Sequence, residues 1–481
     1  MRWQKFKNRC QYLSVVLILT SACNRAELPS GLLPTRTPAP QPNPALATAN
    51  ALAECTQTKL DLTAPPIATG PANGQIGYIT IDGNIAVMDA TGRGVKDITT
   101  DANLDDRSRD LISYRFPTFS NDSKNIAFVS IRSSARTQGM TQTVHTAPTE
   151  NRPKITNLLS TIEDNIPYFD WSPDDQSLAI LGINPTVGSI KVISSTGGTA
   201  RIFDNGTTVY WHWRKDSAAL FAHLGGSTGF NRDAKMSVGD ARNATARKIT
   251  LAPGDFQAPQ FSPNGKYVLV VVNTNNSNEL VLSDSDGNAI CRVTTLTDGG
   301  FFAWSPDGKR IALMDTASPV FEPAPIDIIE IASGKRTRVH EQATAFFWSP
   351  NGQRLAIYSV RSAAESGGVP NDLVGLKQTA DPDLDMNTVP LLRIEFFDIS
   401  SGKSTLIADT LPTRDFVSLL GYFDQYSRAL TPWSPDSTKL VLTGLSLPRE
   451  TTDIAVANIT SSGNIEIKPI GGGTLAFWST R

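Results

Sequence analysis

Short segments rich in apolar residues recur along the chain from about residue 74 to its end, with turn residues between them. Residues 311–314, 355–358 and 326–331 are three of these segments, and in the last of them apolar and polar residues alternate. Alternation with a period of two is typical of half-buried β-strands, which usually run for about four to eight residues. The pattern therefore predicts an all-β chain of many short antiparallel strands.

One short phrase recurs in front of these segments. It starts with Trp or Phe and continues, in its most complete copies, as Ser-Pro-Asp-Gly or Ser-Pro-Asn-Gly. Seven copies begin at Phe119, Trp171, Trp213, Phe261, Trp304, Trp348 and Trp433, and a truncated copy at 477–479 ends the chain. The intervals are 42–52 residues, apart from one of 85, and most are near the period of four-stranded propeller blades. Ser-Pro-Asp-Gly is typical of a type I turn, so each phrase predicts a tight turn between the first and second strands of a blade.

The two ends of the repeat region complement each other. Residues 76–80, 85–89 and 95–99 supply the second, third and fourth strands of a blade, and residues 475–479 supply a first strand with nothing after it. Pairing these segments closes a ring. We therefore predict one β-propeller over residues 73–481, with an insertion at about 360–390. Eight blades follow from this count, and seven if the weak Trp213 copy belongs to another blade.

The phrase resembles the TolB-type, WD-like β-propeller repeats of exported bacterial proteins, over about 85% of the chain. It differs from true WD repeats, because here Trp opens the turn between the first and second strands. The resemblance implies a propeller used as a docking or ligand platform, although similar propellers are joined to peptidases or act as lyases. The repeats occupy everything after residue 72, so we expect no separate catalytic domain.

The N-terminus has the design of an export signal. Four basic residues precede an apolar run at 12–19, which is too short to span a bilayer as an ordinary helix, and small residues then lead to Cys23. This arrangement resembles the lipobox of bacterial lipoproteins, in which the cysteine is diacylated, although Thr20 stands where Leu is most common. We predict a signal peptide at 1–22 and, at 23–72, a lipidated Cys23 with a Pro-rich, extended spacer. The alternative is an ordinary signal cleaved nearby, with Cys23 incidental.

The charge of the chain restricts the classes of partner that we expect, and its cysteines bear on the cellular compartment. The full chain has a net charge of −2, and without residues 1–22 it has 40 Lys and Arg against 46 Asp and Glu, a charge of −6. This balance argues against a nucleic-acid partner. Cys55 and Cys291 could form a disulfide in an exported protein, or remain two free thiols. We expect a membrane-anchored lipoprotein that faces the periplasm or the cell exterior.

Strand alternation places the tight turns on one face of the ring and the long loops on the other, here called the long-loop face. Its loops are expected at 101–116, 131–141, 223–234, 315–324, 360–390, 409–430 and 444–451. Arg and Tyr are common anchors of interfaces, and loops on a rigid scaffold commonly carry function. The candidate binding residues in these loops are Arg107, Arg109, Arg115, Arg132, Arg414, Tyr422, Asp424, Tyr426 and Arg428. The alternative is that these charges are merely solvated.

Signals for metal or catalytic chemistry are weak. Asp381, Asp383 and Asp385 are spaced like the opening of a calcium loop, but Met386 and Leu392 stand where an EF-hand needs Gly and Glu. A G-x-S-x-G match at 225–229 leads into a strand rather than the helix of a nucleophile elbow. The four histidines, His145, His212, His223 and His340, are scattered. We expect no cofactor and no metal.

The sequence thus predicts a monomeric, exported propeller that binds an envelope protein or glycan ligand without catalysis, held at the membrane by an N-terminal lipid anchor. The alternative is a propeller enzyme, a lyase or hydrolase, acting on a polysaccharide or peptide in the central channel. A purely structural assembly role is a third reading.

Overall fold

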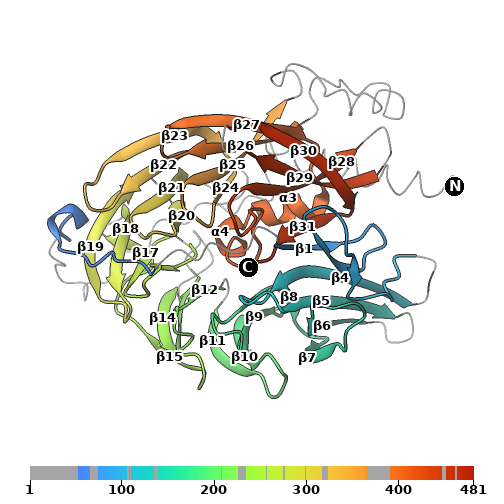
Figure 1. Ribbon diagram of the computed structural model, residues 1–481. Helices are drawn as coiled ribbons and strands as arrows, with labels where there is room; N and C mark the ends of the chain where they lie inside the picture. The colour runs from blue at the N-terminus through green and yellow to red at the C-terminus, as the bar shows by residue number, and fades with distance from the viewer. Residues whose placement is uncertain are drawn as a thin grey trace, which may run out of the picture.

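The computed structural model describes residues 52–65 and 74–480, apart from 106–107, 109, 135–138, 207–208, 226–233, 256, 275–276, 298, 317–322, 363–364, 366–389, 447–450 and 461–462. Within these residues the strands form eight antiparallel sheets arranged as blades around one axis (Figure 1). The prediction of an all-β, eight-bladed propeller is confirmed.

The blades are numbered here in chain order, and each follows the strand order expected from the repeat. Blade 1 contains β31 (Leu475–Trp478), β1 (Gln75–Ile79), β2 (Ile85–Asp89) and β3 (Lys96–Asp97). Blade 2 contains β4 (Asp110–Phe119), β5 (Asn125–Ser134), β6 (Gly139–Pro148) and β7 (Thr156–Thr161). Blade 3 contains β8 (Asn165–Trp171), β9 (Ser177–Ile183), β10 (Gly188–Ser194) and β11 (Arg201–Gly206). Blade 4 contains β12 (Val209–Trp213), β13 (Ala219–Leu224), β14 (Lys235–Asp240) and β15 (Thr245–Lys248).

The second half of the ring repeats this plan, with one blade reduced. Blade 5 contains β16 (Gln260–Phe261), β17 (Tyr267–Thr274), β18 (Ser277–Asp284) and β19 (Ala289–Leu296). Blade 6 contains β20 (Gly299–Trp304), β21 (Arg310–Thr316), β22 (Ala324–Glu330) and β23 (Arg336–Ala343). Blade 7 contains β24 (Ala345–Trp348), β25 (Arg354–Ser362), β26 (Pro390–Asp398) and β27 (Lys403–Thr410). Blade 8 contains β28 (Lys439–Ser446), β29 (Thr451–Ile459) and β30 (Ile465–Gly472), and its first strand is reduced to a bridge between Trp433 and Leu440.

The ring closes between the two ends of the repeat region, as the sequence predicts. Strand β31 pairs antiparallel with β1, from Ile76 opposite Trp478 to Ile79 opposite Leu475. The Ser479 amide then donates to the Gln75 carbonyl over 2.7 Å. Because the innermost strand of blade 1 comes from the far end of the chain, the ends hold each other in place.

The repeated phrase serves two purposes, of which the second is seen in four of its copies. In the Ser305 turn, Gly308 adopts a φ of 70°, which favours glycine, and the Ser305 hydroxyl accepts from the Arg310 amide. The tryptophan before the turn reaches the neighbouring blade, where its Nε1 donates to a backbone carbonyl. Four such bonds join Trp171 to Thr118, Trp304 to Gln260, Trp348 to Ala303 and Trp433 to Phe347. The phrase therefore recurs because it both turns the chain and joins adjacent blades.

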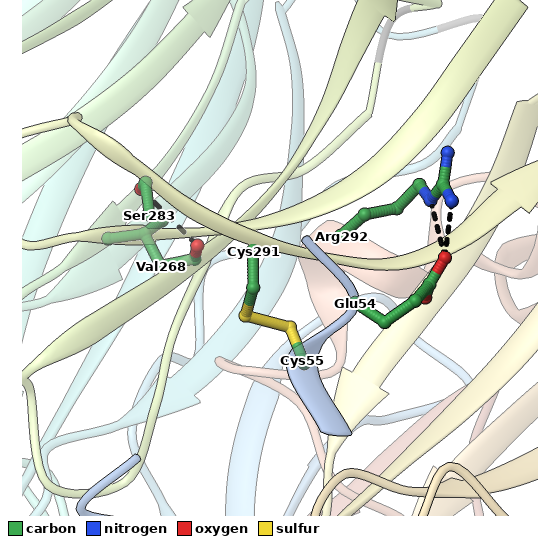
Figure 2. Close-up of a disulfide and its surroundings, with 6 residues drawn as sticks. All are labelled: Glu54, Cys55, Val268, Ser283, Cys291 and Arg292. Atoms are coloured by element: carbon green, nitrogen blue, oxygen red, sulfur yellow. Dashed lines mark hydrogen bonds and ion pairs between the residues drawn. A yellow bond between two sulfur atoms is a disulfide. The ribbon is translucent and has the colours of Figure 1, made fainter. Parts of the chain in front are cut away.

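Residues 52–65, here called the N-terminal strap, pack on blade 5 and differ from the unpacked spacer predicted up to residue 72. Cys55 and Cys291 form a disulfide with an S–S distance of 2.02 Å (Figure 2). Beside it, the Arg292 amide donates to the Ala53 carbonyl over 2.9 Å, and the Arg292 guanidinium pairs with Glu54. Leu60 and Leu62 pack against the apolar cluster of blades 5 and 6. The disulfide is one of the two alternatives that the sequence left open for these cysteines. The other contacts of the strap were not predicted, because they come from β17 and β19, far away in the chain.

Candidate functional site

The centre of the ring is filled by residues 411–430, here called the central plug. It contains α3 (Arg414–Leu420) and α4 (Phe423–Tyr426), which lie inside the circle of blades in Figure 1. Thr413 caps α3 by accepting from the Phe416 amide, and Phe416 and Phe423 are buried. The Phe423 ring lies 5.2 Å from Phe301 and 5.0 Å from Phe346, measured between centroids.

Polar side chains of the plug are bonded to the innermost strands. Arg428 donates to the carbonyls of Trp211 and Pro259, and the Tyr426 hydroxyl donates to the carbonyl of Pro167. The placement of 409–430 as a surface loop is therefore wrong. Asp424, at 3% exposed, and Tyr426, at 8%, face the interior. The wide ring leaves a space at its centre, and the apolar side chains of α3 and α4 fill that space.

Two carboxyls at the centre of the ring are buried, Asp170 on β8 and Asp424 in the plug. Burial raises the pKa of Asp170 to about 7, although hydrogen bonds from Trp211 and Trp213 and the charge of Arg428 oppose the shift. Burial likewise raises the pKa of Asp424 to about 6, against the charge of Arg428. The Asp170 carboxylate accepts from both indole nitrogens, at 2.8 and 3.0 Å. Trp211 and Trp213 are themselves buried.

A surface pocket of about 530 Å³ lies between blades 1 and 2 and is here called the blade 1–2 pocket. It arises because β3 is only two residues long, whereas β6 and β7 beside it have ten and six. Part of the blade 2 face that would otherwise pack on blade 1 is therefore uncovered. The lining includes Ile98, Thr99, Thr100, Asp101, Tyr114, Phe128, Arg132, Thr143, His145, Arg152, Pro153, Ile155 and Asn157.

Three hydrogen-bonded polar side chains lie along one side of the pocket. The Tyr114 hydroxyl donates to Oδ1 of Asp101 over 2.5 Å, and Nη2 of Arg132 donates to Oδ2 over 3.0 Å. Burial favours the neutral carboxyl of Asp101, but the bonds from Tyr114 and Arg132 outweigh it and lower its pKa. Burial and the neighbouring carboxylate raise the pKa of Tyr114. Asp101 is thus ionised and Tyr114 neutral at physiological pH.

His145 is held between two partners. Its Nδ1 lies 2.8 Å from Oδ1 of Asn157, and its Nε2 lies 2.7 Å from the hydroxyl of Ser130. Because a carbonyl oxygen only accepts, Nδ1 carries the proton and Nε2 accepts from Ser130. Burial lowers the His145 pKa to about 4, so the ring is neutral.

The Ser130, His145 and Asn157 group has the connectivity of a nucleophile, a base and an orienting residue. Ser130, however, is 0% exposed, and both nitrogens of His145 are engaged. A nucleophile has to reach its substrate, and the buried hydroxyl of Ser130 is not accessible to one. The arrangement can therefore orient a ligand, but it does not present a reactive group.

The predicted binding residues lie in three places. Arg132 lines the pocket, and Arg115 is exposed on β4. Arg414, at the start of α3, and Tyr422, which is 47% exposed before α4, are exposed residues of the central plug. Asp424, Tyr426 and Arg428 belong to the central plug. Cys23, Arg107, Arg109, Asp381, Asp383 and Asp385 lie outside the described residues.

Sequence reasoning missed Asp101, Arg152 and Asn157 as pocket residues. His145 stood in the sequence as an isolated histidine. The register of the strands could have revealed the pocket residues, because it places His145 opposite Phe128 on β5 and opposite Asn157 on β7. In the part of the chain that the structure describes, no group of three His, Cys, Asp or Glu side chains is placed to hold a metal.

These features define the class of protein: an eight-bladed β-propeller with a filled centre and a pocket between its first two blades. No protein-family model matches the chain. A curated protein, the uncharacterized protein Atu1656 of Agrobacterium fabrum (strain C58 / ATCC 33970), is 24% identical over 144 residues. That match covers 29% of this chain and 47% of the relative, so it spans about half of the relative's length.

Several solved structures are similar in fold. The putative TolB from Agrobacterium tumefaciens is 18% identical with a TM-score of 0.35, over 59% of this chain and 96% of that one. TolB from Acinetobacter baumannii is 12% identical with a TM-score of 0.36, over 62% and 79%. An oligogalacturonate lyase in complex with manganese is 13% identical with a TM-score of 0.46, over 82% and 99%. At these identities the likeness concerns the fold alone.

Proposed function

We propose that this protein is an exported, lipid-anchored propeller that binds a protein or glycan of the cell envelope without catalysing a reaction. The blade 1–2 pocket carries the proposal. Its acid–base groups, Asp101, Tyr114 and His145, are bonded within the protein, while the side chain of Arg132 is 48% exposed. Such a pocket suits recognition better than proton transfer.

Export and anchoring have separate support. The disulfide between Cys55 and Cys291 is of the kind that persists in oxidising compartments, and the sequence before residue 23 has the features of a signal peptide. Labelling cells with a radioactive fatty acid tests the anchor. The wild-type protein should carry label and the Cys23→Ser variant should not, and equal labelling of both would remove the anchor from the proposal.

The competing function is an enzyme that works in the central channel. The central plug opposes it, because Phe423, Asp424 and Gln425 fill the space between the innermost strands and are buried. A channel substrate would have to displace this segment together with its bonds to Trp211 and Pro259. The binding function needs no such rearrangement.

Retention of envelope material by the immobilised mature protein tests the proposed function. An envelope extract, separated into protein and glycan fractions, is passed over wild type, Arg132→Ala and the matched control Arg247→Ala. Arg247 is an exposed arginine of blade 4 that pairs with Asp286, so it matches Arg132 in type and setting. We expect wild type and Arg247→Ala to retain one of the two fractions. Arg132→Ala should retain about tenfold less of that fraction. Equal retention by all three would contradict the proposal, as would release of shortened glycan or peptide products.

A further inference from the structure

The blade 1–2 pocket leaves an unequal set of hydrogen-bonding groups open to a ligand. Arg132 uses Nη2 for Asp101, and its exposed head keeps further N–H groups. Asn157 accepts from His145 through Oδ1, which leaves its Nδ2 as a donor. Arg152 lines the same pocket and is exposed. The open groups are thus mainly donors, and they call for an acceptor on the ligand.

The net charge of the pocket indicates that the acceptor on the ligand is an anion. Arg132 and Arg152 bring two positive charges, Asp101 brings one negative charge, and His145 is neutral because its pKa is depressed to about 4. The pocket therefore carries one net positive charge. Arginine binds carboxylates through parallel N–H groups, so a single carboxylate complements the pocket in both charge and geometry.

The other residues that line the pocket indicate which further groups the ligand carries. Ile98, Pro153 and Ile155 supply an apolar wall beside the polar side chains. Asp101 is 53% exposed, so its carboxylate can also accept from a donor on the ligand. A ligand that fits has one carboxylate, a neighbouring apolar group and an N–H or O–H donor. The last residues of a peptide chain with an apolar side chain have all three, and the volume of about 530 Å³ accommodates them.

We infer that the blade 1–2 pocket binds the free carboxyl terminus of a peptide chain whose last residue is apolar. This inference rests on the proposed function and assigns its ligand to an envelope protein rather than a glycan. The terminal carboxylate lies against Arg132, Arg152 and Asn157, the apolar side chain lies against Ile98 and Ile155, and a peptide N–H donates to Asp101.

Calorimetric titration of the mature protein with acetyl-Ala-Ala-Val as free acid, and with the same peptide as amide, tests the inference. The two peptides differ only in the terminal charge. We expect the acid to bind at least about tenfold more tightly than the amide. 3-Methylbutanoate, which lacks peptide N–H groups, is expected to bind more weakly than the peptide acid. Equal binding of acid and amide, no binding of the acid, or binding of 3-methylbutanoate as tight as that of the peptide acid would overturn the inference.

Two variants locate the binding. Arg132→Ala removes an exposed cation, and Asn157→Asp keeps the acceptor for His145 but replaces the open donor with an anion. Both should weaken acid binding about tenfold or more and leave the circular dichroism spectrum unchanged, whereas Arg247→Ala should bind as wild type. Wild-type affinity in both pocket variants would overturn the inference.

The results separate the two claims. If the acid fails to bind but an envelope fraction is still retained in an Arg132-dependent way, the ligand class is wrong and the proposed function stands. If Arg132→Ala retains envelope material as wild type does, the proposed function itself fails.

Discussion

The Asp170 carboxylate, on the innermost strand of blade 3, accepts hydrogen bonds from two indoles and is 5% exposed. Replacing Asp170 with Asn keeps an acceptor for Trp211 and Trp213 but removes the ionisable group. The pKa of about 7 in the folded protein lies above the ordinary value of 3.8, so the folded state binds more protons than the unfolded chain between these values. Its contribution to stability is therefore complete at low pH and is lost as the pH rises through about 7.

The free energy of unfolding of Asp170→Asn, relative to wild type, should therefore increase from pH 5 to pH 8, by roughly 2–4 kcal/mol. Urea unfolding at both pH values, followed by tryptophan fluorescence, measures this difference. Asp327→Asn is the comparison, because hydrogen bonds and charge from Arg336 and Arg338 outweigh burial and lower the Asp327 pKa. That variant should show no such rise, and parallel curves for Asp170→Asn and wild type would refute the assignment of a raised pKa.

At the scale of elements, the N-terminal strap is joined to blade 5 by one covalent bond, the disulfide between Cys55 and Cys291. The disulfide joins Cys55 to a residue 236 positions further along the chain. The other contacts of the strap are a short bridge, surface ion pairs and the packing of Leu60 and Leu62. Removing both cysteines should lower the free energy of unfolding by roughly 2–5 kcal/mol.

The double variant Cys55→Ala with Cys291→Ala should also expose residues 52–65 to proteolysis, since the strap loses its fixed point. Limited proteolysis with mass spectrometry reports the cleavage sites. Lys266→Ala, which removes only the ion pair with Asp61, serves as the control and should keep the wild-type pattern. A double variant that resists cleavage within the strap as well as wild type does would show that the disulfide is not what holds it.

The elements also show what sequence could reveal. The blades were predictable because turn residues and aromatics recur locally, and in four copies the tryptophan also bonds to the neighbouring blade. The central plug was missed although Phe416, Leu419, Leu420 and Phe423 stand at helical spacing behind a Thr cap. The pocket could not be predicted, because it depends on how few residues β3 contributes and on contacts between separate blades.

For the whole molecule, stability depends on closing the ring. Strand β31 contributes Leu475, Phe477 and Trp478, all at most 3% exposed, to the core. Deleting residues 475–481 should cost roughly 5–9 kcal/mol of apolar burial and leave an edge of β1 unpaired. The expected result is loss of soluble monomer, observed by size-exclusion chromatography. A matched Thr480→Ala variant should elute as wild type, and a truncated chain that stays monomeric with an unchanged melting temperature would disprove the role of closure.

The whole-molecule arrangement also relates the strap to the pocket. The strap lies on blade 5, and blades 1 and 2 lie on the other side of the ring (Figure 1). The pocket between blades 1 and 2 is therefore remote from the strap. In the proposed function, the lipid-anchored segment joins the described part of the chain at the strap, away from the pocket.

Amide hydrogen exchange of the mature protein, with and without the envelope fraction that it retains, tests most directly whether binding occurs in the blade 1–2 pocket. Exchange should slow in residues 98–105, in β5 and in β6, and should stay unchanged in α3 and α4. Protection confined to the central plug and the innermost strands β12 and β16, with none in blade 2, would contradict the account and favour a function at the centre of the ring.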